Sequence, residues 1–305
     1  MTITALPALL ERLERPLLAR WGAAQYSAAC MAAAFLVWPI IEFIGASALA
    51  SVHPMQLVWL RYAVHLGLLL ALGAIRPDLV LLRTKHPFVQ LGRSLLMLFM
   101  PLVWVMSAAR MPMPSVMAIF WLNPLIAVVG ATVLLREWPR RVDVALLGIG
   151  FIAVLLVLDP VVPTHLGGPT LALAMATCFG LYLVGTRWLR REPTSVNLFH
   201  SALGVFCALA PAMPFIWRWP SVRAWMAVLV VGALGLALLF FLDRALHHAT
   251  VARIAPIGFL QPLFETLLFG SLFAGSGSRT VGLLTIACVV VLCVLGGRHA
   301  TTKPS

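Results

Sequence analysis

The sequence predicts an all-α membrane protein with ten transmembrane helices, arranged as two inverted five-helix repeats. Of the 305 residues, 62% are hydrophobic and only 10% are charged, and the mean hydropathy is +1.00. A soluble domain of this size needs far more polar surface. Residues 121–125 and 259–263 form a similar pair of stretches, each reading aromatic, Leu, amide, Pro, Leu. Repetition of such a helix unit indicates internal duplication.

Pro, Gly and charged residues separate ten apolar runs, and a helix that crosses the bilayer needs about 20 residues. The first repeat is expected over residues 27–159 and the second over residues 168–296. We expect residues 1–26 to form a cytoplasmic arm or interfacial helix without a signal peptide, and residues 297–305 a cytoplasmic tail. The expected spans are 27–47, 54–74, 89–109, 114–135, 142–159, 168–187, 196–216, 224–243, 251–271 and 280–296.

Lys and Arg are distributed unevenly between the two sides of the membrane. With the N-terminus inside, fifteen of them fall in inner segments, and the outer segments hold only Arg110, Arg218, Arg223 and Arg279. Positively charged loops face the cytoplasm, so both termini are expected there, in a bacterial-type inner membrane. Topology therefore explains the net charge of +12, which indicates no nucleic-acid partner.

The cysteines and histidines do not form the pattern of a metal site. All five cysteines lie within apolar runs without CxxC spacing, which indicates packing residues rather than disulfides or ligands. His247 and His248 are adjacent, so their side chains point in different directions on a helix. We therefore expect no metal and no cofactor.

The two repeats are expected to have opposite orientations in the membrane. The first and sixth expected spans share the spacing Met-Ala-x-x-Phe-x-x-aromatic, at residues 31–38 and 175–182. Because five spans are an odd number, the second copy enters the membrane from the opposite side, as in many secondary transporters. This plan places a binding site near the membrane midplane between the halves, and their rocking gives alternating access.

With these features the chain resembles the drug/metabolite transporter superfamily, EamA type, whose members have ten helices in two such halves. The resemblance covers nearly the whole chain, although Gly275 stands where Glu137 would repeat. It implies a transporter of small molecules, in a superfamily whose members move amino acids, nucleoside-like metabolites, S-adenosylmethionine, amines or drugs. Residues 92–95, Gly-Arg-Ser-Leu, are similar to the S-adenosylmethionine-transporter branch. The matching residues are Pro54, Arg61, Tyr62, Pro124, Glu137, Gly148, Gly168, Phe179, Tyr182 and Pro262.

Asn123 and Gln261 are the main candidates for substrate binding, together with Trp38 and Tyr182. Each amide precedes a proline near the middle of its span, and the proline frees the carbonyl four residues earlier, Phe120 in the first copy. At this depth such a carbonyl needs a partner in the protein or a water-lined cavity. The aromatic rings would form apolar or cation-facing walls. A kink that only shapes helix packing is the alternative.

Charged residues inside spans are costly and are therefore functional candidates. Glu42 and Arg61 lie roughly 8 and 10 Å from the outer ends of adjoining spans, which suggests an ion pair that gates transport or binds substrate. A purely structural clamp is the alternative. Glu265 follows Gln261 by one helical turn and is the only acidic residue in its expected span. We hypothesise that Glu265 couples transport to protons; a pair with Arg61 or a counter-ion role are the alternatives.

Three further polar residues are expected to have structural roles. Arg93 should extend its charged end toward the lipid headgroups. His65 should be a satisfied packing residue. Glu137 is expected to order its loop by pairing with Arg140 or Arg141.

The function predicted is secondary active transport of small polar or amphipathic metabolites, such as an amino acid, an S-adenosylmethionine-like compound, or an amine or drug. Two other classes stay open, namely a membrane-embedded enzyme for lipid-linked substrates and a passive channel or facilitator. The apolar spans hold no DxxD or HxxxH pair and no nucleophile–base spacing, which argues against an enzyme. The expected partners are the small-molecule substrate, the lipid bilayer and protons.

Overall fold

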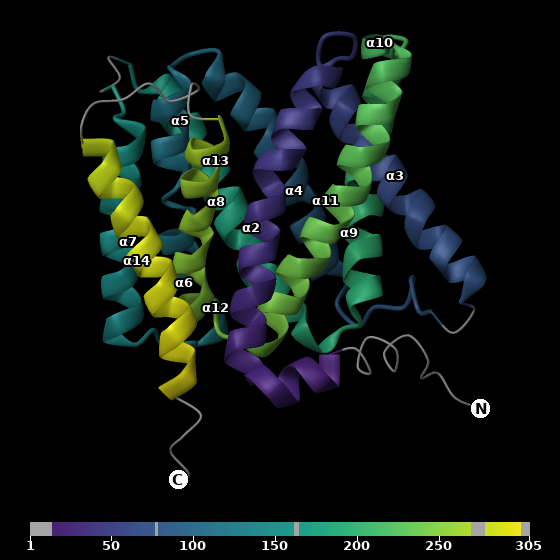
Figure 1. The fold of residues 1–305 in the computed structure, drawn as a ribbon. Helices are drawn as coiled ribbons and strands as arrows, with labels where there is room; N and C mark the ends of the chain where they lie inside the picture. Colours follow the sequence, from purple (N-terminus) through teal and green to yellow (C-terminus); the bar gives the residue numbers. More distant parts are fainter. Residues whose placement is uncertain (1–13, 77–78, 162–164, 270–277, 300–305) are drawn as a thin grey trace, which may run out of the picture.

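The computed structural model describes residues 14–76, 79–161, 165–269 and 278–299 (Figure 1). All regular elements in these ranges are helices, which satisfy their own backbone polar groups in lipid. The first half contains α2 (Ala23–Ala48), α3 (Pro54–Ile75), α4 (Pro87–Ala108), α5 (Met113–Phe120), α6 (Asn123–Leu135) and α7 (Arg141–Leu158). The second half contains α8 (Gly167–Trp188), η1 (Leu189–Arg191), α9 (Thr194–Leu209), η2 (Ala210–Ala212), α10 (Met213–Ile216), α11 (Val222–His248), α12 (Val251–Ile254), η3 (Ala255–Phe259), α13 (Leu260–Phe269) and α14 (Ser278–His299).

Eight helical segments in the described part of the chain are long and apolar enough to cross a membrane. α5 and α6 together form one of them, and α9, η2 and α10 form another. The other two expected spans correspond to the broken segment α12–η3–α13 and to α14, although residues 270 and 271 lie outside the described ranges. The all-helical class is therefore confirmed, and the ten-helix inverted repeat stays a prediction.

The two proline sites interrupt their helices in different ways. α5 ends at Phe120 and α6 begins at Asn123, where the sequence predicts a break. In the second half, α12 is followed by a 3-10 segment over Ala255–Phe259 before α13 begins. Pro256 in this segment has no counterpart in the first half, where Ala118 occupies the matching position. Because this extra proline removes another helical donor, the second break is longer.

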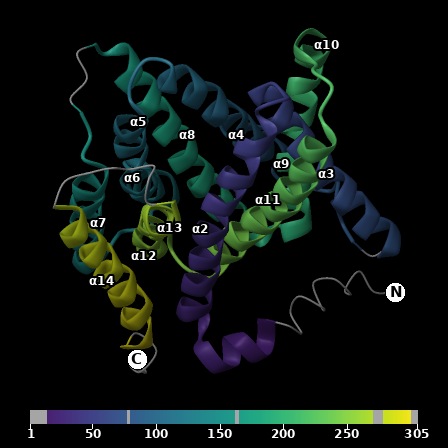
Figure 2. The ribbon, with the colours of Figure 1, turned by 45° about the horizontal axis from the view of Figure 1, so that its top comes forward.

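Helices of the two halves pack along one another in pairs. α2 packs along α11, α4 along α8 and α7 along α14 (Figure 1 and Figure 2). Each pair joins the first half to the second, so the interface between the halves runs through the whole bundle. α2 begins and α14 ends at the same end of the bundle (Figure 1). We call it the arginine-rich end, because its connections and helix ends carry Arg136, Arg140, Arg141, Arg187, Arg190, Arg191 and Arg244.

Glycines set how closely some of these helices approach. A Cβ atom at Gly232 of α11 would lie 2.5 Å from Val64 Cβ of α3, far inside van der Waals contact. A Cβ atom at Gly67, one turn further along α3, would meet no atom within 4 Å. The two positions therefore differ in the space around them but share helical backbone.

We expect Gly232→Ala to destabilise the protein by about 1–3 kcal/mol, because overpacking forces α3 and α11 apart. Gly67→Ala should be neutral or stabilise by up to about 1 kcal/mol, because alanine favours a helix more than glycine does. Thermal unfolding of both variants in detergent measures the difference. Equal effects would contradict the close approach of α3 and α11.

Candidate functional site

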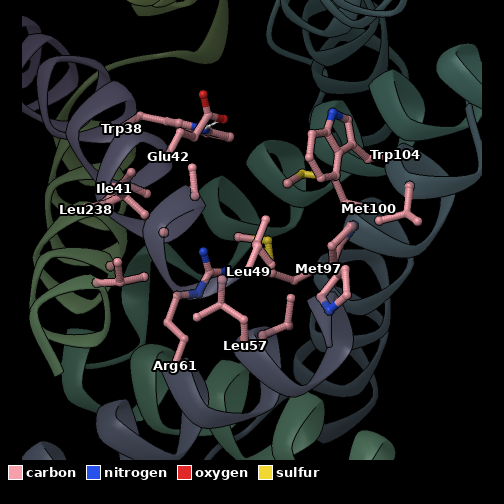
Figure 3. Close-up of a pocket in the computed structure, with 18 of the residues that line it drawn as sticks. Trp38, Ile41, Glu42, Leu49, Leu57, Arg61, Met97, Met100, Trp104 and Leu238 are labelled. Atoms are coloured by element: carbon pink, nitrogen blue, oxygen red, sulfur yellow. Dashed lines mark hydrogen bonds between the residues drawn. The ribbon is translucent and has the colours of Figure 1, made fainter. Parts of the chain in front are cut away.

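A cavity of about 450 Å³ lies between the two halves (Figure 3). It reaches Leu49 and Pro54, which flank the α2–α3 connection at the end of the bundle opposite the arginine-rich end (Figure 1). Its lining comes from α2, α3, α4 and α5 of the first half and from α8, α11 and α13 of the second. Leu49, Pro54 and Met113, near the α2–α3 and α4–α5 connections, form its outer rim. Small-molecule sites usually have volumes of about 300–1,000 Å³, so the cavity can hold a metabolite.

Most of the cavity lining is apolar. Trp38 and Trp104 lie on opposite sides of the cavity in Figure 3. Tryptophan ring faces attract cations and also stack on flat apolar groups. Methionine side chains are flexible and polarisable, so they adapt to ligands of different shape. The methionines in the lining are Met55, Met97, Met100, Met113, Met117 and Met175.

Among the described lining residues, the ionisable ones are Glu42, Arg61, His65 and Glu265. Glu42 belongs to α2 and Glu265 to α13, so each half supplies one carboxylate. Trp38 Nε1 donates to Glu42 Oε1 at 2.6 Å, which orients that carboxylate at the cavity wall. The lining thus holds two carboxylates and one guanidinium in a largely apolar wall.

The ion pair expected between Glu42 and Arg61 is absent from the ion pairs of the described residues. Glu42 accepts the hydrogen bond from Trp38 on its own helix instead. The Arg61 guanidinium lies 5.0 Å from the centroid of the Tyr62 ring and donates to Tyr62 Oη at 3.4 Å. Arg61 Nε has no hydrogen-bond partner among the described atoms. Both charged groups therefore remain available to a ligand.

His65 and Glu265 also present polar groups to the cavity. His65 was expected to be a satisfied packing residue; its buried ring interacts with the Gly232 backbone of α11, but neither ring nitrogen reaches standard hydrogen-bond geometry with a described atom. The edge of its ring packs against Tyr62, with centroids 4.9 Å apart. Glu265 forms no ion pair with Arg61 among the described residues. The alternative of a static Glu265–Arg61 pair is thus not what the structure contains.

An aromatic layer, which we call the floor, separates the cavity from the arginine-rich end. Its rings are Trp38, Phe120 and Phe179, with centroids 5.1 to 6.3 Å apart. Tyr182 follows Phe179 on α8 toward the arginine-rich end and lies beneath the floor, almost fully buried. The Arg93 guanidinium lies 5.3 Å from the centroid of the Tyr182 ring. Tyr182, predicted to bind substrate, therefore does not line the cavity.

Asn123 and Gln261 also lie outside the cavity lining, and both side chains are fully buried. Asn123 Nδ2 donates to the Phe120 carbonyl at 2.9 Å. The amide thus satisfies the carbonyl that Pro124 frees, where the sequence predicted a cavity-lining role. Asn123 Oδ1 and both polar atoms of the Gln261 amide have no partner among the described atoms.

Comparison with known proteins establishes the family. Residues 25–159 and 166–296 each match the EamA-like transporter family. The chain belongs to the EamA-like transporter family. The two matched regions coincide with the two halves described above, and the match confirms the resemblance to the drug/metabolite transporter superfamily. The family match and the eight long apolar helical segments of the described residues together indicate a multi-pass membrane protein.

Several relatives of the chain share one name. The S-adenosylmethionine uptake transporters of Rickettsia conorii and Rickettsia felis are each 26% identical to it over 192 residues. The alignment covers 61% of this chain and 64% of each relative, so it spans less than two thirds of their length. A protein of known crystal structure shares the fold, with a TM-score of 0.75 and 22% identity over 90% of this chain and 98% of that one.

A polar network that the sequence did not predict joins the two halves of this EamA-like transporter. Arg93, which was expected to reach the headgroups, is instead 2% exposed. It donates to the Asn197 carbonyl, to Gln90 Oε1 at 3.1 Å and to Thr186 Oγ1 at 3.2 Å. Gln90 Nε2 donates to Asn197 Oδ1, and Asn197 Nδ2 to Asp243 Oδ1, each at 2.8 Å. The i, i+3 spacing of Gln90 and Arg93 was the available signal, because it places both on one helix face.

Glu137 also connects the halves rather than ordering its own loop. Arg187 Nε donates to Glu137 Oε1 at 2.7 Å, and Arg190 lies 3.9 Å from the same oxygen. Arg140, an expected partner of Glu137, pairs with Asp143 at 2.7 Å. Asp143 lies one turn from Arg140 at the start of α7, so Arg140 pairs with Asp143 instead of Glu137. Glu137 and the polar network together join the halves near the arginine-rich end.

We expect Asn123→Leu to destabilise the protein by about 1–3 kcal/mol, because the buried Phe120 carbonyl loses its donor. Gln261→Leu is the matched control, since it removes a buried amide that has no partner and should leave stability unchanged or higher. Thermal unfolding in detergent compares the two. An equal loss of stability in both variants would argue against the specific role of Asn123.

Proposed function

We propose that this transporter moves a small amphipathic metabolite with a cationic group, of the S-adenosylmethionine type, across a bacterial inner membrane by secondary active transport. The observation that carries the proposal is a cavity with one carboxylate from each half, set in a wall of aromatic rings and methionines. The relatives named S-adenosylmethionine uptake transporters support the same ligand class.

The two carboxylates can divide two roles between them. Glu42, held by Trp38, is placed to receive a sulfonium group beside a tryptophan ring. Arg61 can pair with the carboxylate of a zwitterion, and the aromatic and methionine walls can hold a flat base. Glu265 then remains for a proton. A neutral apolar molecule would leave these charges buried without a partner, which disfavours its binding.

The cavity is open toward one end of the bundle and closed toward the arginine-rich end, which fits one state of an alternating-access cycle. The floor and the polar network lie between the cavity and the arginine-rich end. If that end faces the cytoplasm, as the distribution of Lys and Arg predicts, the cavity faces outward. In the opposite state the floor would open and bring Asn123, Tyr182 and Gln261 into the pathway. Asn123 Oδ1 and the Gln261 amide, which have no partner among the described atoms, would then have a ligand to bind.

S-Adenosylmethionine should raise the thermal stability of the purified protein, because it binds the folded state. S-Adenosylhomocysteine lacks the sulfonium charge and should bind at least about tenfold more weakly, since a desolvated cation–π contact contributes about 2 kcal/mol and the attraction to Glu42 is lost as well. Glu42→Gln should weaken binding of the sulfonium ligand by a similar factor. Met100→Leu is the matched control in the same wall, because it conserves volume and charge.

Equal binding of the two ligands, or unchanged binding by Glu42→Gln, would overturn the ligand class. In proteoliposomes, accumulation of labelled S-adenosylmethionine against its gradient indicates active transport, whereas equilibration alone indicates a passive channel. Chemical conversion of the ligand by the protein in detergent would indicate an enzyme. These three outcomes separate the classes that the sequence leaves open.

Glu265→Gln should abolish accumulation driven by a pH gradient while substrate exchange at equal pH continues. The reason is that Glu265 is the second carboxylate of the cavity and stays free to carry a proton when Glu42 binds the cation. The first half has no matching carboxylate, because Ala127 occupies that position. Transport in proteoliposomes with and without an imposed gradient measures both activities. A wild-type response to the gradient rules out Glu265 as the proton carrier, and loss of exchange as well would assign it to binding.

A further inference from the structure

The segment that precedes the two repeats lies across the arginine-rich end of the bundle. Residues 14–21 form a helix that turns away from the direction of α2 instead of continuing it (Figure 1 and Figure 2). Gly22 makes the turn, with a φ of 78° in the region that favours glycine. Leu18 packs against the hydrophobic core. We call residues 14–21 the arm, and its contacts show that it is docked on the bundle.

Glu14 connects the arm to the second half. Its two carboxylate oxygens accept hydrogen bonds from Nε and Nη2 of Arg244 on α11, each at 2.5 Å. Tyr26 Oη donates to Glu14 Oε1 at 2.6 Å. Glu14 is only 6% exposed, which is rare for glutamate without such partners. Burial raises the pKa of this carboxyl, but interactions with His248, Arg244 and Tyr26 outweigh burial and hold the pKa at about 2.

Arg244 extends this connection into the polar network. Its Nη1 donates to Thr194 Oγ1 at 3.1 Å, and Thr194 Oγ1 donates to Asp243 Oδ2 at 2.6 Å. From Asp243 the hydrogen bonds continue through Asn197 to Gln90 on α4. One continuous chain of polar contacts therefore runs from the arm through α11 and α9 to α4. The arm therefore helps to close the arginine-rich end of the bundle.

We propose that the arm is a latch, in which the Glu14–Arg244 pair holds the arginine-rich end closed and must separate before that end can open. The proposal rests on the alternating access proposed above. Opening this end requires helices of the two halves to separate, and the arm, which leads directly into α2, is tied to α11. A buried bidentate pair stabilises the closed state more than an exposed pair does. A segment outside both repeats thereby controls one side of the transport cycle.

Cys30 provides a native reporter for this latch. It lies on α2, one helical turn from Tyr26, and is buried. With the other four cysteines changed to serine, labelling of Cys30 by a bulky, charged maleimide measures how often this end opens. We expect Glu14→Gln to raise the labelling rate by at least about tenfold, because hydrogen bonds between charged groups are lost. Arg20→Gln is the matched control, since it changes one charge on the exposed face of the same arm.

A second variant keeps the test decisive if Glu14→Gln folds poorly. Glu14→Cys with Arg244→Cys allows the arm to be joined to α11 by a reducible bifunctional thiol reagent. Mass spectrometry of the peptide that contains Cys30 then measures its labelling separately from the new cysteines. The joined protein should label slowly, and the same protein after reduction should label at least about tenfold faster. Exchange of labelled S-adenosylmethionine in proteoliposomes should stop on joining and return on reduction.

Unchanged Cys30 labelling in folded Glu14→Gln protein, or equal labelling of the joined and reduced forms, would overturn the latch. An equal increase in Arg20→Gln would likewise assign the effect to general destabilisation of the arm. The labelling experiments need no substrate, so they stand even if S-adenosylmethionine does not bind. Failure of ligand binding with a normal labelling difference would reject the proposed substrate and retain the latch.

Discussion

Hydrocarbon offers no hydrogen bonds, so each polar group within the membrane must find its partner inside the protein. Continuous helices meet this constraint by themselves, but the broken ones do not. At the first break, the Asn123 amide supplies a donor for the Phe120 carbonyl. At the arginine-rich end, buried polar side chains satisfy one another across the two halves. In the cavity, Arg61 Nε and both ring nitrogens of His65 have no hydrogen-bond partner among the described atoms, and outside the lining the same holds for Asn123 Oδ1 and the Gln261 amide. These atoms are the ones that can gain partners when a ligand binds or when the opposite state forms.

The cost of charge in lipid made several site residues predictable from the sequence. Trp38, Glu42, Arg61 and Glu265 line the cavity, and they were selected by depth, charge or repeat position. The all-helical class and the break at Asn123 followed from composition and one proline. The pairing of polar groups did not, because partners such as Gln90 and Asn197, or Glu137 and Arg187, come from opposite halves and lie 107 and 50 residues apart in the chain. Local spacing instead favoured short-range alternatives, such as the pair expected between Glu42 and Arg61.

The internal duplication produces two similar halves, and residues that lack a counterpart in the other half make the two halves differ. In the inverted repeat predicted for this chain, the halves can exchange their conformations, which makes two states of similar energy accessible. Glu265 and Glu137 have Ala127 and Gly275 at their matching positions, so these charges are present in one half only. Glu137 joins the halves near the arginine-rich end, and Glu265 faces the cavity on the other side. We infer that such asymmetry sets the relative populations of the two states and links their exchange to a ligand.

Spin-label distance measurements across both ends of the bundle show whether one cavity is exposed alternately to the two sides of the membrane. One pair, at Leu49 and Val105, spans the rim of the cavity, and another, at Arg20 and Arg191, spans the arginine-rich end. The measurement is made in liposomes with S-adenosylmethionine and an imposed pH gradient. We expect the Leu49–Val105 distance to shorten in the same fraction of molecules in which the Arg20–Arg191 distance lengthens. Simultaneous opening of both ends, or no change at either end while transport proceeds, would contradict this expectation.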